Sequence, residues 1–420
     1  MTTYDHAAQR RFALDVVAQL RAAGHTAYFA GGCVRDELLG RVPKDYDVAT
    51  SARPEQIRAV FGHRKTLAIG EAFGVIAVVG PKPAGMVEAT TFRRDAGYSD
   101  GRRPDAVEFT DAEEDARRRD FTMNALFFDP LNEEVIDFVG GRDDIARRLV
   151  RAVGDPRARF DEDKLRMLRA VRMASRFSFD LDPATADAIR AAAHEITIVS
   201  PERIAQEMRA MLGKPGQTEA ARLLATTRLL DAILPEIVPE FGMPSSDAWQ
   251  HTLSVFAEFE RAQAFGGFAL GLASLLHTTE RELVFTVAQR WRLANAERDD
   301  AAWLVAHQAD LLEAATKPWS EIQPLLADSR APQLVDLVEA ELRVEGAALD
   351  DLEFCRAKLA LPRAELDPPP LVTGNDLIRA GLKPGKAFAG LIAQLRAAQL
   401  DGKIQTTAEG IELAKRLMNS

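Results

Sequence analysis

The chain of 420 residues carries 53 basic and 63 acidic side chains, a formal net charge of −10, and 47% of its residues are hydrophobic. A chain of this length usually folds around more than one hydrophobic core, so we expect two or more domains. The composition is ordinary for a soluble globular protein. The two cysteines, Cys33 and Cys355, exclude a disulfide framework. No apolar run is long enough to cross a membrane, and the charged start "MTTYDHAAQRRFALD" lacks the core of a signal peptide, so we expect a soluble cytoplasmic protein with no membrane partner.

The distribution of charge is more informative than its total. An acidic protein is a poor partner for nucleic acid unless its positive charge is gathered locally. Between Arg142 and Arg176 the sequence has ten arginines and Lys164 against six acidic residues. This local basic excess is compatible with an anionic substrate.

Residues 1–140 mix helical and strand patterns, which predicts an α+β domain with a mixed sheet. Helices are expected where apolar residues recur every three or four positions, and strands where short β-branched runs occur. The expected elements are a helix over 7–23, a strand at "TAYFA", a helix at "CVRDELLG", a strand at "YDVAT", a helix at "RPEQIRAVFG", and strands at "FGVIAVVG" and "MVEATTFR".

From about residue 141 onward the pattern is helical nearly throughout. The segments "DEDKLRMLRAVRMASRFSF", "DPATADAIRAAAHEI" and "SPERIAQEMRAMLG" each have helical spacing. The stretches "PEFGMPSSD" (239–247) and "DPPPLVTG" (367–374) are rich in helix-breaking residues and are candidate boundaries. The sequence thus predicts an α+β domain, a long helical body and a small C-terminal module.

Gly31 and Gly32 lie between an expected strand and an expected helix. Glycine lacks a Cβ, so backbone N–H groups can approach a ligand there, and the helix directs the positive end of its dipole to the same place. Arg35, on the first turn, can donate charge-assisted hydrogen bonds to phosphate. The pattern indicates a phosphate-binding turn, and a glycine turn with a surface arginine is the alternative. The motifs G-x-G-x-x-G and G-x-x-x-x-G-K-[ST] are absent here, which excludes a dinucleotide fold and a P-loop at this place.

Asp45 and Asp47 are two residues apart on an expected strand, so their side chains point to the same face. Adjacent carboxylates repel each other unless a cation lies between them, and Mg²⁺ suits carboxylates combined with phosphate oxygens. Two such ions can activate a hydroxyl nucleophile and neutralise a leaving pyrophosphate. Glu88, on a later strand that can lie beside the first, is the candidate third carboxylate, as metal ligand or general base. A solvated loop and an exposed strand glutamate are the alternatives.

The segment "RRRDFTMNA" (117–125) gathers Arg119, Asp120 and Asn124 just before an apolar stretch. The arginine can hold a triphosphate or a ribose while Asp120 orients it. A helix N-terminus capped by Asp120 is the alternative.

A second polar cluster lies in "DEDKLRMLRAVR" (161–172). Residues at three-residue intervals on one helix form a single ridge. Aspartate only accepts hydrogen bonds and arginine only donates them, so Asp163 and Arg166 together can read the edge of cytosine or adenine and reject guanine and uracil. A salt-bridge ladder on a solvated helix is the alternative. The ridge comprises Asp163, Arg166, Arg169 and Arg172.

Five motifs, "GGCVRD", "DYD", "VEATTFR", "RRDFTMNA" and "EDKLRMLRAVR", occur in the order found in the class II tRNA nucleotidyltransferase/poly(A) polymerase family, which the chain resembles over nearly its whole length. The C-terminal "TGNDLIRAGLKPG" and "RAAQLDGKI" are similar to the tail of its longer bacterial members. The resemblance implies a polymerase-beta-like nucleotidyltransferase head, a helical neck with the base-selecting helix and an RNA-binding segment, a body like a degenerate HD domain, and a tail that contacts tRNA. The corresponding ranges are 1–140, 141–235, 236–365 and 366–420.

The resemblance also implies Mg²⁺-dependent addition of C, C and A to the 3′ end of tRNA from CTP and ATP. By motif it assigns Asp45 and Asp47 to the metal, Gly32, Arg35 and Arg119 to the nucleotide, and Asp163, Arg166, Arg169 and Arg172 to the base and triphosphate. The residue patterns described above add Glu88 to the catalytic carboxylates Asp45 and Asp47, and add Gly31, Asp120 and Asn124 to the nucleotide-binding positions. The number of subunits, one or two, stays open.

Departures from the family pattern separate its branches. The stretch "TLAIGEAFGVIAVV" lacks the basic run and His-Val element of the poly(A) polymerases, which favours a tRNA substrate. In the family, CC-adding enzymes resemble a version in which the loop before "RRDFT" is shortened. Here this loop, "RRDAGYSDGRRPDAVEFT", has full length, and its length favours complete CCA addition. A CC-adding or A-adding specialist, a poly(A) polymerase and a catalytically inactive tRNA-binding protein are the alternatives.

The segments "QHTLSV" and "ASLLHTTERE" resemble part of a metal-dependent phosphohydrolase (HD) domain. The expected His-Asp pair reads His277-Thr278, and threonine is a poor substitute for a carboxylate ligand. We therefore interpret His251 and His277 as core or capping residues, with phosphohydrolase activity as the alternative.

Overall fold

The computed structural model describes residues 5–96, 106–237, 246–383 and 388–419. The chain divides into two compact units, Met1–Met211 with Glu219–Pro239, and Leu212–Thr218 with Glu240–Ser420. Parts of two predicted segments, 97–105 of "RRDAGYSDGRRPDAVEFT" and most of "PEFGMPSSD", lie outside the described residues.

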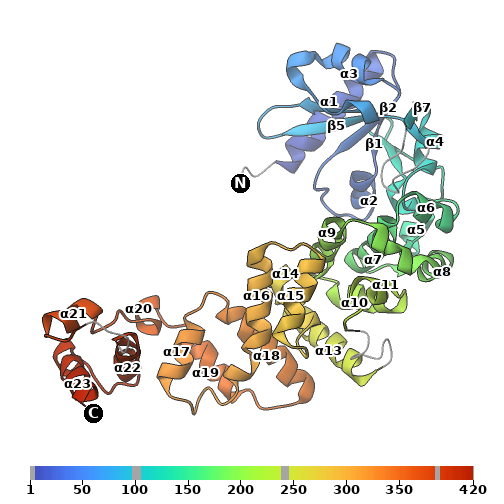
Figure 1. Ribbon diagram of the computed structural model, residues 1–420. Helices are drawn as coiled ribbons and strands as arrows, with labels where there is room; N and C mark the ends of the chain where they lie inside the picture. Colours follow the sequence, from blue (N-terminus) through green and yellow to red (C-terminus); the bar gives the residue numbers. More distant parts are fainter. Residues whose placement is uncertain (1–4, 97–105, 238–245, 384–387, 420) are drawn as a thin grey trace. The chain divides into compact units, whose positions relative to one another are not determined.

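A seven-stranded sheet forms the centre of the first unit (Figure 1). Its strands are β1 (Ala27–Ala30), β2 (Asp47–Thr50), β3 (Thr66–Gly70), β4 (Val75–Val79), β5 (Met86–Thr91), β8 (Phe127–Asp129) and β9 (Glu134–Ile136). The strand order is β3-β4-β5-β2-β1-β8-β9, with β2 and β5 parallel and the other neighbours antiparallel. This is the mixed sheet that the sequence predicts.

The expected N-terminal helix is α1 (His6–Ala22), which contacts β1, β2 and β5. Its buried side chains include Ala13, Val16, Val17 and Leu20, which recur with the helical period and so face the sheet together. In another buried cluster of this unit, the rings of Phe92 and Phe127 meet edge to face, with 5.8 Å between their centroids. Burial of these apolar faces holds the strands that carry the polar site.

The remaining elements of the first unit surround this sheet or continue beyond it as helices. β6 pairs antiparallel with β7, and a parallel pair, β10 with β11, interrupts the region expected to be helical. The bounds are α2 (Gly32–Leu38), α3 (Pro54–Phe61), η1 (His63–Lys65), η2 (Glu71–Phe73), β6 (Arg93–Ala96), β7 (Ala106–Phe109), α4 (Ala112–Arg117), η3 (Thr122–Asn124), α5 (Gly141–Ala146), β10 (Leu149–Val150), α6 (Pro156–Glu162), α7 (Leu165–Phe177), β11 (Asp180–Leu181), α8 (Pro183–Ala192), η4 (Ala193–Ile198), α9 (Pro201–Met211), α10 (Gln217–Thr226, which begins in the second unit) and α11 (Leu229–Ile233).

Two predicted elements differ from the structure. Asp45 and Asp47 were expected on one strand, but β2 begins at Asp47, so Asp45 lies before the strand. The single helix expected from 161 is two helices, α6 and α7, because Asp163 has an extended backbone (φ −148°, ψ 107°). Its Oδ1 accepts a hydrogen bond from Leu165 N at 3.0 Å, a local bond of the kind by which aspartate competes with helix continuation.

All regular elements described in the second unit are helical. Its largest buried side chains are Trp249, Trp291 and Phe256. The irregular stretch between α20 and α21 contains "DPPPLVT", as its prolines predict, and the last three helices have a core of their own around Leu377 and Leu395. The bounds are α13 (Asp247–Ala262), α14 (Phe268–Leu275), α15 (Arg281–Arg290), α16 (Asn295–Ala306), η5 (Gln308–Leu311), α17 (Trp319–Leu326), α18 (Ala331–Glu345), α19 (Asp350–Leu359), α20 (Arg363–Leu366), α21 (Gly374–Arg379), α22 (Phe388–Leu400) and α23 (Thr407–Asn419).

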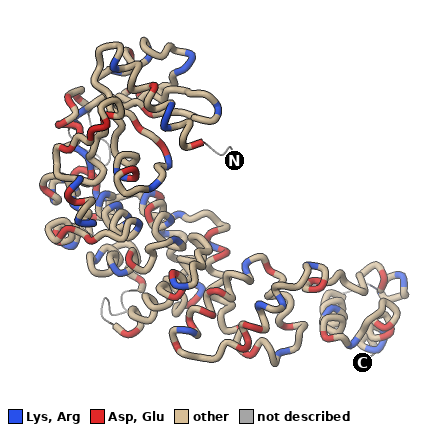
Figure 2. The backbone as a smooth tube through the Cα atoms, turned by 180° about the vertical axis from the view of Figure 1, so that it is seen from behind, with Lys and Arg blue, Asp and Glu red and all other residues tan. Residues whose placement is uncertain are grey.

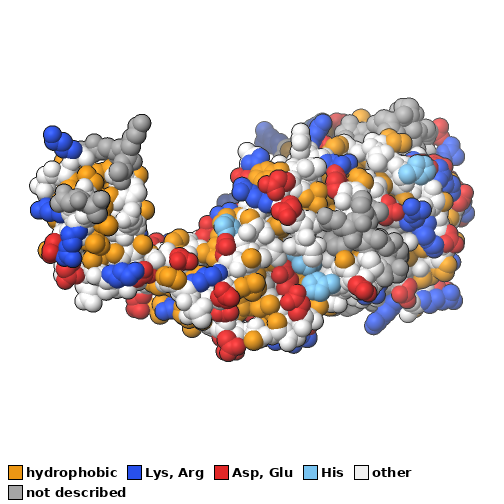
Figure 3. Space-filling view, turned by 60° about the horizontal axis from the view of Figure 1, so that its bottom comes forward, with side chains coloured by type: hydrophobic (Ala, Val, Ile, Leu, Met, Phe, Trp, Pro, Cys, Tyr) orange, Lys and Arg blue, Asp and Glu red, His pale blue; other side chains and the backbone are white. Residues whose placement is uncertain are grey.

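Basic and acidic residues are mixed along the chain (Figure 2) and lie interspersed on the face drawn in Figure 3. Part of the basic excess around α6 and α7 is compensated by acidic partners. Glu195, for example, pairs with both Arg157 (2.6 Å) and Lys164 (2.5 Å). Within the described ranges, no helix combines the length and the apolar character needed to span a membrane.

Candidate active site

The paired carboxylates lie where β2 begins beside β5. Asp47 and Glu88 are register partners on these parallel strands, which confirms that the strand of Glu88 lies beside the strand of Asp47. The pKa of Asp47 is raised to about 7, mainly by burial and also by the negative charges of Asp45 and Glu88, while the charge of Arg119 opposes the shift. The negative charges of Asp45, Asp47 and Glu88 are therefore only partly balanced by Arg119. A bound cation would reduce their mutual repulsion.

The carboxylates near the start of β2 suit a divalent ion that is coordinated partly by the protein and partly by the substrate. Across the described residues, no group of three or more His, Cys, Asp and Glu side chains is arranged to hold a metal ion. Mg²⁺ is typically bound through one or two carboxylates together with phosphate oxygens and water rather than by a closed protein cage. Asp45 and Asp47 could supply two carboxylates, and an ion bound there would take its remaining ligands from phosphate oxygens and water.

The glycine turn is set by backbone conformation and close contacts. Gly31 has φ +72° and ψ −122°, which L side chains rarely adopt, and its N–H donates to Leu126 O at 3.0 Å. A Cβ on Gly31 would lie 2.8 Å from Arg119 Nη1. The helix that follows has only seven residues. A helix this short carries a small dipole, so positive charge at the turn comes mainly from arginine side chains.

Substituting Gly31 by alanine is expected to lower both stability and nucleotide affinity. The unfavourable backbone conformation costs about 1–3 kcal/mol, and the added methyl group displaces Arg119. Gly40→Ala is the matched control, because Gly40 has φ +66° with nothing within 4 Å of the added Cβ. Denaturant unfolding and nucleotide KM are measured for both variants. An unchanged KM in Gly31→Ala would contradict the assignment of Arg119 to the nucleotide.

Arg35 is more buried than the sequence suggested. Only 7% of the residue is exposed, and its guanidinium donates to Asp36 Oδ1 (2.7 Å) and to Asn124 Oδ1 (2.6 Å). It also lies 4.4 Å from the ring centre of Phe177. The alternative of an exposed surface arginine is therefore wrong, and Arg35 joins the glycine turn to the "RRDFTMNA" segment.

The expectation that Asp120 orients Arg119 is wrong. Asp120 pairs instead with Arg169 at 2.6 Å and accepts a hydrogen bond from Asn124 Nδ2 at 3.3 Å. Burial alone would raise the pKa of Asp120, but the charge of Arg169 and these hydrogen bonds outweigh it, and the pKa lies below its usual value. Arg119 is held by Asp115 on α4, with Nη2 to Oδ2 at 3.0 Å.

The predicted ridge on α7 is not a ladder of pairs within one helix. Asp163 pairs with Arg203 of α9 at 2.7 Å, and Arg172 pairs with Glu207 of the same helix at 3.0 Å. Arg166 pairs with Glu162 and donates to the Arg159 carbonyl at 3.1 Å. Partners from neighbouring elements fix these side chains, which excludes the alternative of a solvated helix face.

One cavity of about 450 Å³ gathers most of the predicted residues. Asp45 and Arg172 are not among its lining residues. Arg118, Thr90 and Met173 also line it and were missed by the sequence reasoning. The sequence did contain a signal for an ion pair between Arg118 and Asp115, because the two residues are three positions apart in a helical segment. The predicted residues that line the cavity are Gly31, Gly32, Arg35, Asp47, Glu88, Arg119, Asp120, Asn124, Asp163, Arg166 and Arg169.

The two histidines of the HD-like segment lie together in the second unit. His277 Nε2 is 3.3 Å from His251 Nδ1, and His277 Nδ1 is 2.8 Å from the Ser274 carbonyl oxygen. His277 is 8% exposed, and burial lowers its pKa to about 4. As expected, His277 is a buried residue whose ring is engaged by neighbouring groups.

Comparisons with known proteins agree with this arrangement. The model of the poly A polymerase head domain matches residues 27–151, and that of the probable RNA and SrmB-binding site of polymerase A matches residues 178–241. The CCA-adding enzyme of Geobacillus thermodenitrificans is 38% identical over 83% of this chain and 82% of its own. That of Lactobacillus helveticus is 31% identical over 95% of each.

A solved structure extends the likeness to the fold of nearly the whole chain. The Bacillus stearothermophilus CCA-adding enzyme in complex with CTP has a TM-score of 0.77 and 31% identity, over 98% of this chain and 99% of that one. The Thermotoga maritima CCA-adding enzyme complexed with tRNA, at 20% identity and a TM-score of 0.70, shares the fold. The chain therefore belongs to the class II tRNA nucleotidyltransferase/poly(A) polymerase family, and the four relatives compared above are CCA-adding enzymes.

Proposed function

We propose that the protein is a template-independent tRNA nucleotidyltransferase that adds C, C and A to the tRNA 3′ end from CTP and ATP. The observation that carries the proposal is that one cavity is lined both by the acidic residues Asp47 and Glu88 and by Asp163 and Arg166, a hydrogen-bonding pair suited to one base edge. The relatives over most of the chain length are CCA-adding enzymes, which supports this substrate.

In the proposed reaction the 3′-hydroxyl oxygen of the tRNA forms a bond to the α-phosphorus of the nucleotide. The bond to the β-phosphate oxygen breaks, and pyrophosphate leaves. Asp45 and Asp47 would hold two Mg²⁺ ions, which when bound lower the pKa of the hydroxyl and neutralise negative charge. Glu88 is positioned to assist as a ligand or as the acceptor of the hydroxyl proton.

The remaining cavity residues bind and orient the nucleotide. Gly31, Gly32, Arg35 and Arg119 would face its phosphates, and Asp163 with Arg166 its base. Asp163 accepts from the exocyclic amine of cytosine or adenine, and Arg166 donates to the adjacent ring nitrogen. Asn124 and Asp120 link the two regions through Arg35 and Arg169. Arg172, bound to Glu207, would support the ridge from outside the cavity.

We also propose that the chain is organised as head, neck, body and tail over 1–140, 141–235, 236–365 and 366–420, with tRNA contacts in the neck and tail. A cytoplasmic location is in keeping with Cys33 and Cys355, which are both unpaired and buried.

Extension of defined tRNAs tests the function. Transcripts ending before C74, after C74 and after C75 are incubated with CTP, ATP and Mg²⁺, and the products are sequenced. Complete CCA ends on all three are expected. Extension of only some transcripts would assign a CC-adding or A-adding enzyme, a long A tail on any RNA would assign a poly(A) polymerase, and no extension would overturn the proposal.

A further inference from the structure

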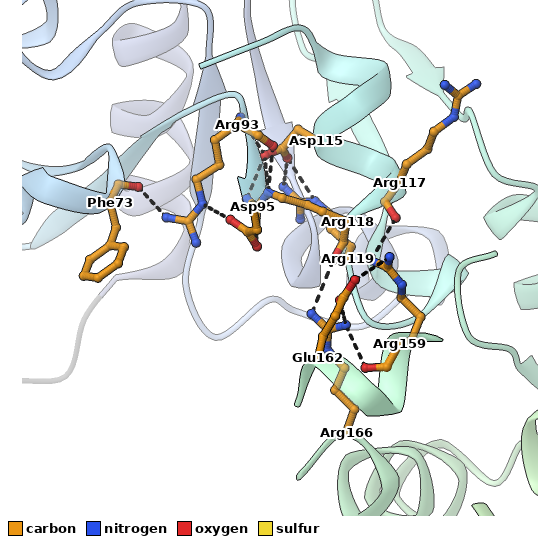
Figure 4. A network of polar contacts seen from close by, with 10 residues as sticks. All are labelled: Phe73, Arg93, Asp95, Asp115, Arg117, Arg118, Arg119, Arg159, Glu162 and Arg166. Atoms are coloured by element: carbon orange, nitrogen blue, oxygen red, sulfur yellow. Dashed lines mark hydrogen bonds and ion pairs between the residues drawn. The ribbon is translucent and has the colours of Figure 1, made fainter. Parts of the chain in front are cut away.

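Asp115 of α4 is a buried carboxylate that holds two arginines (Figure 4). Its side chain is 1% exposed. One oxygen, Oδ1, accepts from Arg118 Nε at 2.9 Å and Nη2 at 2.7 Å, and also from Arg93 N at 3.2 Å. The other, Oδ2, accepts from Arg119 Nε at 3.2 Å and Nη2 at 3.0 Å. Each oxygen thus serves one guanidinium, and the backbone of β6 is tied to the same group.

The ion pair with Asp115 holds Arg119 in one orientation toward the cavity. With Nε and Nη2 bound to Asp115, Nη1 donates to the Asn124 carbonyl at 3.2 Å and lies against Gly31. The Phe127 ring lies 5.0 Å from the guanidinium carbon. Arg119 is 20% exposed at its side chain and lines the cavity, whereas Asp115 is not a lining residue. Any effect of Asp115 on a ligand therefore passes through an arginine.

The charge of Asp115 is itself secured by its partners. Burial would raise the pKa of this carboxyl, but the charges and hydrogen bonds of Arg119 and Arg118 outweigh burial and hold the pKa below its usual value. Each oxygen of this carboxylate accepts two N–H groups from one guanidinium, and these charge-assisted bonds restrain both arginines in distance and in direction. Without its charge, Arg119 loses the partner that keeps it beside the glycine turn.

We propose that Asp115 is a positioning residue for nucleotide binding, which holds Arg119 at the glycine turn where the triphosphate common to CTP and ATP is bound. This rests on the function proposed above. The groups that face the base have partners outside the cluster of Asp115 and its two arginines, Asp163 in Arg203 and Arg166 in Glu162. Arg166 meets the cluster only at the backbone carbonyl of Arg118, at 3.5 Å, and not at a side chain that Asp115 binds (Figure 4). Asp115 therefore sets the affinity for nucleotide and does not choose the base.

The test compares Asp115→Asn with Glu113→Gln, a control on the same helix whose partner Arg117 is exposed. KM and kcat are measured for CTP on tRNA ending before C74 and for ATP on tRNA ending after C75. In Asp115→Asn both KM values are expected to rise by the same factor, about ten- to a hundred-fold, as for loss of a hydrogen bond to a charged group. The change in kcat is smaller, and the preference over UTP and GTP stays as in wild type.

A double-mutant cycle separates positioning from general damage. If Asp115 acts through Arg119, Asp115→Asn changes KM little once Arg119→Ala is present, and the two effects do not add. Asp115→Glu is the second variant, because it keeps the charge that folding needs while moving the carboxylate away from Arg119. A folded variant of either kind with wild-type KM values, additive effects in the cycle, or a KM change confined to one nucleotide would overturn the inference. Failure of the wild-type enzyme to extend tRNA would instead overturn the proposed function.

Discussion

Replacing Asp47 by asparagine is expected to abolish nucleotide addition while leaving tRNA binding nearly unchanged. The substitution keeps the shape of the side chain but removes one of the two carboxylates proposed to hold metal beside the phosphates. Loss of a preorganised electrostatic group lowers kcat by about a thousandfold, or about 4 kcal/mol. Extension rates and tRNA dissociation constants are measured in the same buffer with Mg²⁺.

The stability of this variant provides an independent readout. Asp47 is repelled by Asp45 and Glu88 in the protein alone, so removing its charge should not lower the unfolding temperature in buffer containing EDTA. Asp15→Asn, at an exposed position of α1, is the control and should keep wild-type rates. A variant of Asp47 that still extends tRNA at near wild-type rates, or that loses tRNA affinity, would remove the metal role from this residue.

Replacing Asp163 by asparagine is expected to weaken the choice of base. Aspartate only accepts hydrogen bonds, whereas the asparagine amide also donates and so tolerates the carbonyl oxygens of uracil and guanine. Discrimination of CTP and ATP against UTP and GTP should shrink by about a hundredfold, or about 2.7 kcal/mol. Competition assays with nucleotide pairs, followed by sequencing of the products, measure this ratio.

Asp161→Asn is the matched control, since Asp161 lies two residues earlier and pairs with Lys164 at a half-exposed position. It should leave the ratio unchanged. An unaltered ratio in Asp163→Asn, with rates lowered equally for all four nucleotides, would show that Asp163 supports the helix rather than reading the base. The result expected for Asp115→Asn, a change in KM without a change in selectivity, is the converse pattern.

The strands and the site composition were predictable because their signals are local. Short β-branched runs separated by glycine mark the strands, and motifs such as "GGCVRD" and "RRDFTMNA" each place their polar residues within a few positions. Eleven of the thirteen predicted site residues line one cavity. The exceptions are Asp45, which precedes β2, and Arg172, which is bound by Glu207.

The pairing of side chains was less predictable, because it depends on elements distant in the sequence. Asp120 was expected to orient Arg119, yet α7 brings Arg169 to Asp120 while Asp115, one helical turn before Arg119, occupies that role. The predicted helix from 161 breaks at Asp163, whose side chain binds the backbone of Leu165 and the guanidinium of Arg203. Spacing along one helix contains no information on a partner that packs against it from α9.

The sequence by itself determined which chemical groups the protein has for its reaction: two neighbouring aspartates, a glycine turn, and arginines near Asp163, which is proposed to recognise the base. These follow from residue types at short spacing. Only the tertiary structure decided that Glu88 faces Asp47, through the parallel pairing of β2 and β5, and that Asp115 restrains Arg119 at Gly31. The physical reason is that a hydrogen bond or an ion pair requires contact within a few ångströms, and contact between distant segments is set by how their apolar faces pack.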